Sequence, residues 1–257
     1  MIRHLRIAGV GFAVEYAREE IWPTIARGLD GFESAAEAND IRIQVSVDLS
    51  LHRFEGARAL PVRTADGLRG EDYELCAVGA GFRLIQSADP FPLSAALKAL
   101  LASELLRRGA VLVHGVGVAR ADRAALFSGP SGAGKSTLGC HARAGGLSLL
   151  ADELVVLRRG EDGAFEVEGT PWNVGAPRKA TLAAIGVLAH AIRHRVEEVP
   201  PTEVLRVLTT NILLPAEAAT TRHQAFEIAR AALATTRTVR LHFAPDPSVV
   251  ETLDPLL

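Results

Sequence analysis

This 257-residue sequence contains Gly129-Pro130-Ser131-Gly132-Ala133-Gly134-Lys135-Ser136, the stretch that decides its fold. The stretch completes the pattern G-x-x-x-x-G-K-[ST]. A short apolar segment, residues 124–128, leads directly into Gly129, and the residues from Lys135 onward are typical of a helix. Strand, glycine-rich turn and helix in this order predict a phosphate-binding loop, or P-loop. The alternative is a glycine-rich turn that fits the pattern by chance, and it leaves the flanking strand and helix unexplained.

The residue types in this stretch explain how it would bind a nucleotide. Glycines let the backbone pass close to a polyphosphate, so that successive N–H groups and a helix N-terminus face the anion. We expect Lys135 to reach the β- and γ-phosphates of a nucleoside triphosphate and the Ser136 hydroxyl to ligate Mg²⁺. Thr137 is expected to touch a phosphate as well. The predicted nucleotide-binding residues are Gly129, Ser131, Gly132, Ala133, Gly134, Lys135, Ser136 and Thr137.

An acidic pair follows the next expected strand. Residues 148–151 form that strand, and Asp152-Glu153 comes directly after it. Because the carboxyl ends of strands in a parallel α/β sheet gather where the phosphate loop lies, we expect Asp152 near Ser136. One carboxylate would serve the metal, directly or through water, and the other would orient or deprotonate a nucleophile. A solvated turn between two strands is the alternative for both residues.

Two further polar residues lie at expected strand ends. His114 closes the segment 111–113, and a histidine beside an aspartate can hold its orientation or relay a proton. Spacing alone favours a core histidine instead. Glu168 ends a strand and is a candidate second Mg²⁺ ligand, with a plain edge-strand carboxylate as the alternative.

The loop after Glu168 contains residues with two interpretations each. Trp172 would stack on a base or wall off an acceptor pocket, or it would simply pack against the core. Arg178 and Lys179 would neutralise a transferring phosphate, or they would be solvated loop cations.

Composition restricts the class of protein. The sequence has 48% hydrophobic and 23% charged residues, enough for a buried core. Its 28 basic and 30 acidic residues give a net charge of −2, which argues against a nucleic-acid partner. Cys76 and Cys140 have no metal or redox spacing and are expected to be buried in a reducing cytoplasm. We see no signal-peptide layout and no apolar run near the ~18 residues of a membrane span, so we expect a soluble, cytoplasmic protein without a membrane partner.

Two domains are expected, with the boundary at Asp89-Pro90-Phe91-Pro92 and Pro92 at the first position of a helix that ends at Gly109. Residues 1–90 read as a small α+β domain and residues 91–257 as the P-loop domain. In the first domain we expect strands at 2–15, 41–47, 59–63 and 73–86 and a helix at about 19–29. In the second we expect strands at 110–119, 124–128, 147–151, 153–158, 164–168 and 237–243, and helices at 135–144, 201–210, 216–234 and after Pro247.

Three segments in this order resemble the catalytic domain of HPr kinase/phosphorylase and its shorter HPr-kinase-like relatives. They are His114-Gly115-Val116, the P-loop, and Leu150-Ala151-Asp152-Glu153 one helix later. The resemblance covers roughly residues 92–190. It implies an α/β fold related to phosphoenolpyruvate carboxykinase, in which a mixed sheet bears the P-loop and a small α+β domain precedes it.

The resemblance also implies roles. Asp152 matches the family's catalytic base, which takes the proton of an acceptor serine, and His114 matches the histidine that supports this base. Lys135 and Ser136 match the phosphate and Mg²⁺ residues, with Lys135 counted in the catalytic set.

Two carboxylates are implied as Mg²⁺ ligands beside Ser136. Glu168 resembles the family's second metal-binding carboxylate, and Glu153 stands where the full enzymes have a second aspartate. The Glu-x-Arg-Gly-Leu-Gly run of the full enzymes is replaced here by Glu168-Gly169-Thr170-Pro171-Trp172. The sequence therefore resembles the shorter relatives more than the sugar-regulation enzyme.

The expected function is an ATP-dependent kinase that uses ATP and Mg²⁺ to phosphorylate a hydroxyl, preferably serine, of a protein or peptide. The resemblance suggests a homo-oligomer. One alternative is a P-loop ATPase or nucleotide-gated binding module in which Glu153 orients water. The short stretch between Lys135 and Asp152 leaves little room for the extra strands of such ATPases. Another alternative is a kinase for a small metabolite.

Overall fold

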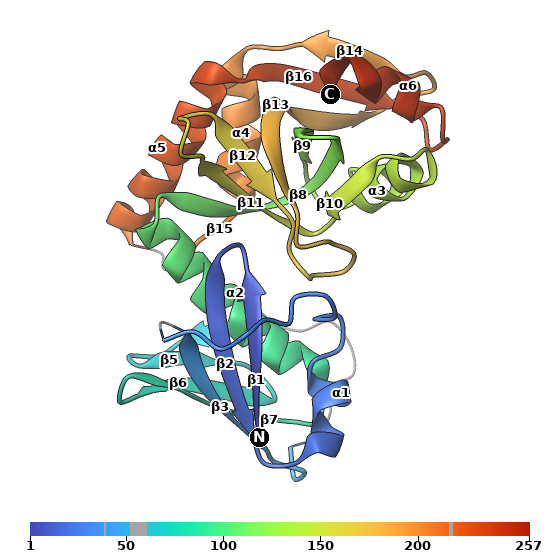
Figure 1. Cartoon of the computed structure of the whole chain (residues 1–257). Coiled ribbons are helices and arrows are strands. Elements are labelled where there is room, and N and C mark those ends of the chain that lie inside the picture. The colour runs from blue at the N-terminus through green and yellow to red at the C-terminus, as the bar shows by residue number, and fades with distance from the viewer. Residues whose placement is uncertain (39, 52–60, 216–217) are drawn as a thin grey trace. The chain divides into compact units, whose positions relative to one another are not determined.

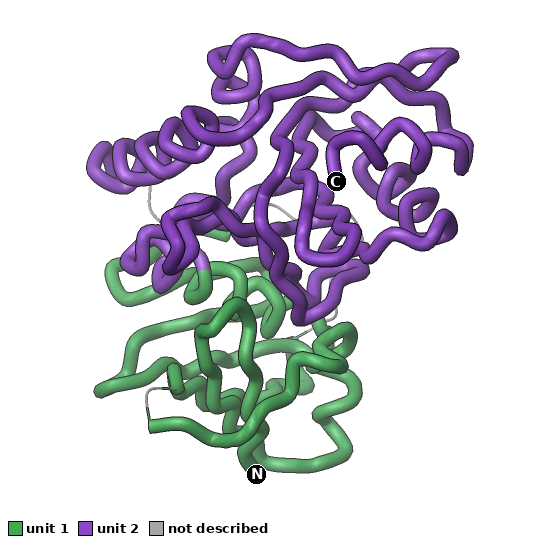
Figure 2. Tube along the Cα trace, turned by 45° about the horizontal axis from the view of Figure 1, so that its top comes forward, with its two compact units in different colours: residues 1–101 green, residues 102–257 purple. Residues whose placement is uncertain are grey.

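The computed structural model describes residues 1–38, 40–51, 61–215 and 218–257. They form two compact units, Met1–Leu101 and Ala102–Leu257 (Figure 2). The division falls inside helix α2 (Pro90–Arg107) and not at its start, where the sequence placed the domain boundary.

Helix α2 begins at Pro90 rather than at Pro92. The Asp89 carboxylate accepts a hydrogen bond from the Phe91 N–H at 2.8 Å, so it caps the helix. The rule that proline suits the first helical position is therefore met by the earlier of the two prolines.

Unit 1 contains, within its described residues, a seven-stranded sheet in the order β1-β2-β3-β7-β6-β5-β4. Residues 2–15 and 73–86, each expected as one strand, are hairpins that turn at Ala8-Gly9 and at Gly79, all with positive φ. The helix expected at 19–29 is shorter, and Gly28 follows it with a positive φ. The strands are β1 (Ile2–Ile7), β2 (Val10–Tyr16), β3 (Ile41–Val47), β4 (Val62–Arg63), β5 (Gly67–Arg69), β6 (Tyr73–Val78) and β7 (Gly81–Gln86), and the helices are η1 (Glu19–Ile21) and α1 (Trp22–Ile25). Positions 59 and 60 of the strand expected at 59–63 lie outside the described residues.

Unit 2 is a mixed α/β unit whose described residues include a nine-stranded sheet (Figure 1). Its strands are β8 (Ala110–Arg120), β9 (Arg123–Ser128), β10 (Ser148–Ala151), β11 (Leu154–Arg159), β12 (Phe165–Glu168), β13 (Lys179–His190), β14 (Arg195–Glu198), β15 (Ile212–Leu213) and β16 (Arg237–Phe243). Its helices are α3 (Lys135–Ala144), α4 (Pro201–Asn211), α5 (Ala219–Thr235), α6 (Val249–Leu253) and η2 (Asp254–Leu256). Positions 216 and 217 of the helix expected at 216–234 lie outside the described residues.

The sheet of unit 2 is mixed, as expected. We had nevertheless assumed parallel strands when we placed Asp152 near Ser136 beside residues 129–134, here called the glycine loop. Strand β9 pairs antiparallel with β8 and parallel with β13, and β13 pairs parallel with β16. Five strands pair with one another in a closed ring, each with the next in the order β8, β9, β13, β12, β11 and back to β8. The carboxyl ends of β9, β13 and β16 therefore lie at one edge, as in a parallel sheet, although β8 runs the opposite way.

The acidic pair lies between two collinear strands. Ala151 of β10 pairs with Gly117, and Leu154 of β11 pairs with His114, so the end of β10 and the start of β11 follow β8 in one register. Asp152-Glu153 interrupts this course for two residues. Because β9 and β10 are both antiparallel to β8, they run in the same direction, and their carboxyl ends face the same side. This relation, rather than a parallel sheet, brings Asp152 to the glycine loop.

Two hydrophobic clusters cover the two faces of the sheet. Residues of α4 and α5, such as Leu208 and Ala229, pack against one face. Residues of α3 and α6, such as Leu138 and Val249, pack against the other. Alternate residues of β9 divide between the clusters, as the side-chain period of a strand requires. The strand that leads into the glycine loop is thus buried on both faces.

Strand β13 was not expected from the sequence. Its first four residues, Lys-Ala-Thr-Leu, alternate between polar and apolar, but the next seven, Ala-Ala-Ile-Gly-Val-Leu-Ala, contain no polar side chain. Such a pattern is typical of a strand that is covered on both faces. Strand β13 pairs with β9, β12 and β16, so it is central to unit 2, although it was absent from the elements that we expected.

Two further expectations concern exposure and membranes. Cys140 is exposed and Cys76 is partly exposed, so the expectation that both are buried was wrong. In the ranges that the structure describes, no helix has the length and apolar character needed to cross a membrane.

Candidate functional site

The glycine loop, residues 129–134, connects β9 to α3 (Figure 1). Gly132 and Gly134 have φ of 79° and 94°, which a residue with a side chain rarely adopts. The Ala133 N–H bonds the Pro130 carbonyl, and the first helical bond runs from Leu138 N to Gly134 O at 2.8 Å. The N–H groups at the start of a helix have no partner within the helix. The amides of residues 135–137 therefore form the kind of helix terminus that binds anions.

Two side chains pack against the glycine loop: His190, the last residue of β13, and Phe243, the last residue of β16. A Cβ on Gly134 would lie 2.6 Å from the ring of Phe243, so only glycine fits there. His190 places its Nε2 at 2.9 Å from the Gly132 carbonyl oxygen and stacks on Phe243. Neither His190 nor Phe243 was expected at the site.

Lys135 turns back over the glycine loop. Its ammonium donates to the carbonyls of Gly129 at 2.9 Å and Pro130 at 3.0 Å. The residue is only 8% exposed, and burial lowers the pKa of its ammonium. The cation is thus held at the mouth of the loop by two carbonyl groups, and a phosphate is the partner that would satisfy its charge.

A pocket of about 340 Å³ joins the glycine loop to the acidic pair. The expected site residues that it brings together are His114, Ser131, Gly132, Gly134, Lys135, Ser136, Thr137, Asp152 and Glu153, and Asn173 joins them. Apart from the two glycines, every lining residue carries a polar side chain. It combines a cation, a helix N-terminus and two carboxylates within one cavity, and this combination suits a metal-bound polyphosphate beside a proton acceptor.

Asp152 is 6% exposed, yet its carboxylate lines the pocket. Its Oδ2 accepts a hydrogen bond from Asn173 Nδ2 at 2.7 Å, and its Oδ1 accepts one from Val174 N at 3.0 Å. A Cβ on Gly139 of α3 would meet the Asp152 Cβ at 3.3 Å, so the helix packs closely behind the carboxylate. The sequence contained no signal for Asn173 beyond its place in a loop.

His114 lies within β8, as the strand expected at 110–119 required, and not at a strand end, where we had placed it after the segment 111–113. Its side chain is exposed and lines the pocket, which does not fit the alternative of a core histidine. The next residue, Gly115, donates its N–H to the Glu153 carbonyl at 3.1 Å. That bond fixes the backbone of Glu153 beside β8.

Glu168 lies outside the pocket, at the end of β12. Its Oε2 lies 2.7 Å from a guanidinium nitrogen of Arg158. The two groups form an ion pair, but their geometry is not that of a hydrogen bond. Burial raises the pKa of Glu168, and the positive charges of Arg158 and Lys179 oppose this rise. The structure therefore does not bring Glu168 to Ser136.

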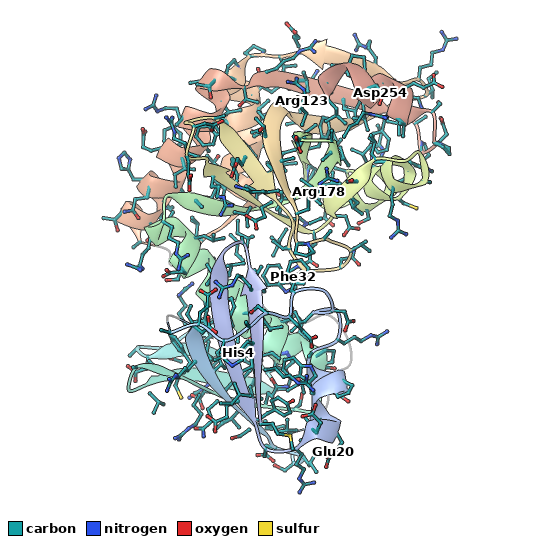
Figure 3. All side chains as sticks on the ribbon, in the orientation of Figure 1. His4, Glu20, Phe32, Arg123, Arg178 and Asp254 are labelled. Atoms are coloured by element: carbon teal, nitrogen blue, oxygen red, sulfur yellow. The ribbon has the colours of Figure 1, made fainter. Side chains whose placement is uncertain are left out.

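The remaining residues that we singled out in the loop pack or pair elsewhere. Trp172 is buried, as its packing alternative required. Arg178, labelled in Figure 3, donates to the Ser148 hydroxyl and to the Ala121 carbonyl. Lys179 pairs with Glu166 at 3.2 Å. None of the three lines the pocket.

The oxygen ligands near the glycine loop would suit a magnesium ion that takes most of its other ligands from a bound nucleotide and from water. Among the described residues, no group of three or more His, Cys, Asp or Glu side chains is placed to hold a metal. Magnesium in phosphoryl-transfer sites is bound through one or two protein oxygens, with phosphate oxygens and water as the other ligands. The Ser136 hydroxyl and the Glu153 carboxylate line the same pocket and supply such oxygens.

No protein-family model matches the sequence, and no curated protein matches it either.

Proposed function

We propose that this protein is an ATP-dependent phosphotransferase of the HPr-kinase-like type, which moves the γ-phosphate of ATP to a hydroxyl, preferably serine, of a protein or peptide. The observation that supports this most is that Lys135, Ser136 and Asp152 line the same pocket. The glycine loop and Lys135 alone would only bind a nucleotide. A buried carboxylate at the same cavity adds a proton acceptor for the incoming hydroxyl.

The glycine loop and α3 would bind the triphosphate through backbone N–H groups, with the Lys135 ammonium on the β- and γ-phosphates. Ser136 and Glu153 would hold Mg²⁺, which neutralises the charge that develops on the phosphates. These assignments use residues that line one pocket.

Asp152 would act on the acceptor. The acceptor oxygen forms a bond to the γ-phosphorus while the bond from that phosphorus to the β–γ bridging oxygen breaks and ADP leaves. The hydroxyl proton passes to Asp152. Each carboxylate oxygen has two acceptor positions and uses one for Asn173 or Val174, so one on each oxygen stays available for this proton. His114, in the same pocket, would support Asp152.

A second candidate is an ATPase or a nucleotide-gated binding module. The observation that favours it is that Glu153 lines the pocket beside Asp152, where it would orient a water molecule instead of a metal. In that case the product is free phosphate, and binding of a partner is the output. A kinase for a small metabolite would use the same residues with a different acceptor.

Transfer from γ-labelled ATP separates these candidates. The purified protein is incubated with Mg²⁺, labelled ATP and serine-containing peptides or proteins encoded beside its gene. We expect label in a peptide or protein band. Label that appears only as free phosphate would refute the kinase and favour the ATPase, and label in a small molecule would favour the metabolite kinase.

A further inference from the structure

The loop between β12 and β13, residues 169–178, supplies the groups that hold Asp152. We propose that Asn173 is the positioning residue of this site: its amide fixes the carboxylate of Asp152 in the orientation in which it meets the acceptor. This inference rests on the proposed function, because it assumes that Asp152 receives the acceptor's proton.

Both oxygens of the Asp152 carboxylate are engaged from the loop. Asn173 Nδ2 donates to Oδ2 at 2.7 Å, and Val174 N donates to Oδ1 at 3.0 Å. The Asp152 N–H in turn approaches the Val174 carbonyl at 3.2 Å. An ionised carboxylate only accepts hydrogen bonds, so the side chain of Asn173 must present its NH₂ group to it. Two donors on different oxygens prevent the carboxylate from rotating about its Cβ–Cγ bond.

The backbone of Asn173 is held in an uncommon conformation. Its φ is 60°, one of few positive values at non-glycine residues in the described chain. Asparagine tolerates this left-handed region better than most residues, and such strain is found where surrounding structure imposes it. Here the left-handed turn is what lets the Asn173 side chain and the next N–H group reach one carboxylate together.

The loop itself is fastened along β10. Ala176 N donates to Leu150 O at 2.9 Å, and Gly175 forms a bridge with Ala151. A Cβ on Gly175 would lie 1.8 Å from the Thr170 carbonyl oxygen, so the two sides of the loop are in close backbone contact. The loop is therefore packed before any substrate arrives, and it reduces the reorganisation that the acceptor has to induce.

The experiment compares Asn173→Gly with Asn173→Ala and the wild type. Glycine adopts a positive φ without cost, so Asn173→Gly keeps the turn and removes only the amide. Alanine removes the amide and also opposes the turn. The protection of the Val174 amide proton from hydrogen exchange, read by NMR, reports whether the turn and its bond to Asp152 Oδ1 are intact. Turnover of Mg·ATP, by acceptor labelling and phosphate release, and the dissociation constant for ATP are then measured for each protein.

We expect Asn173→Gly to lower kcat by roughly 10- to 100-fold while the dissociation constant for ATP and the exchange protection of the Val174 amide stay unchanged. Asn173→Ala should lose as much turnover and also melt at a lower temperature. If Asn173 serves only the shape of the turn, Asn173→Gly keeps wild-type turnover, and that result would overturn the inference. A loss of ATP affinity in Asn173→Gly with kcat unchanged would overturn it as well.

A failure of the proposed function gives a different result. In that case the wild type transfers label to no acceptor: it releases only free phosphate, or it turns over no Mg·ATP at all. The contact is then tested through the side-chain amide resonances of Asn173 in Asp152→Ala. They shift if the hydrogen bond exists, and unchanged resonances overturn the inference independently of activity.

Discussion

The Nε2 atom of His190 and the carbonyl oxygen of Gly132 lie 2.9 Å apart, and this contact joins the end of β13 to the glycine loop. The imidazole ring also stacks on Phe243, whose ring limits the space at Gly134. The conformation of the loop therefore depends on side chains from two strands that follow it far along the chain.

Replacing His190 by alanine removes the bond to Gly132 and should weaken ATP binding. A hydrogen bond of this kind contributes about 0.5–1.5 kcal/mol, which corresponds to a dissociation constant roughly 2- to 10-fold higher. The constant is measured by calorimetric titration with ATP. His223→Ala, which removes an exposed imidazole on α5, is the matched control and should bind ATP as the wild type does. Equal affinities for all three proteins would contradict the role of His190.

Alanine at Gly134 should destabilise the protein more than alanine at Gly132. Both glycines have positive φ, and a left-handed conformation costs a residue with a side chain about 1–2 kcal/mol. A Cβ on Gly132 meets nothing within 4 Å, whereas one on Gly134 meets the Phe243 ring at 2.6 Å. The overlap adds roughly 1–3 kcal/mol. Denaturant unfolding of the two variants measures the difference, and equal losses would show that Phe243 does not confine the loop.

These residues show how far the sequence predicts the structure. Helix α3 and strand β9 agree closely with expectation, because a glycine motif between an apolar run and a helix fixes both elements locally. Strand β13 was missed because residues 183–189, most of its length, are apolar or glycine without alternation, as in a strand covered on both faces. His190 lies at its end, so the brace on the glycine loop could not be predicted.

The acidic part of the site was predicted with the wrong premise. Asp152 reaches the pocket because β10 and β9 are both antiparallel to β8, not because the sheet is parallel. The contact from Asn173 depends on a positive φ in a ten-residue loop and on a strand pairing across β10. Asparagine tolerates that conformation, but its presence in a loop does not indicate which side chain it will meet.

Lys135→Ala should raise the dissociation constant for ATP by roughly 10- to 100-fold, since a hydrogen bond to a charged group contributes about 1.5–3 kcal/mol. Fluorescence titration with a labelled ATP analogue measures this. Lys179→Ala removes the same charge from a lysine that pairs with Glu166 outside the pocket, and it should leave the affinity unchanged. Two variants with the same affinity would argue against the glycine loop as the nucleotide site.

Glu168 should make stability depend on pH in a definite direction. Burial raises the pKa of its carboxyl in the folded state, so the folded state binds this proton more tightly than the unfolded chain does. The free energy of unfolding should therefore gain a contribution as pH falls through the raised pKa toward the ordinary value of glutamate. That contribution is absent above the raised pKa.

Glu168→Gln removes this titration. Relative to the variant, the wild type should become more stable as pH falls across that interval, as measured by denaturant unfolding at several pH values. Glu161→Gln, in the exposed turn between β11 and β12, makes the same chemical change and serves as the control. A difference between wild type and Glu168→Gln that does not vary with pH would contradict the assignment.

The central claim is tested most directly by Asp152→Asn, measured for ATP binding and for transfer from γ-labelled ATP in the same preparation. Asparagine keeps the shape of the side chain but cannot take the acceptor's proton, and the glycine loop is untouched. We predict that the variant binds Mg·ATP as the wild type does and transfers no label to any acceptor that the wild type modifies. Transfer at the wild-type rate by Asp152→Asn would contradict the claim that this carboxylate is the base of a phosphotransferase.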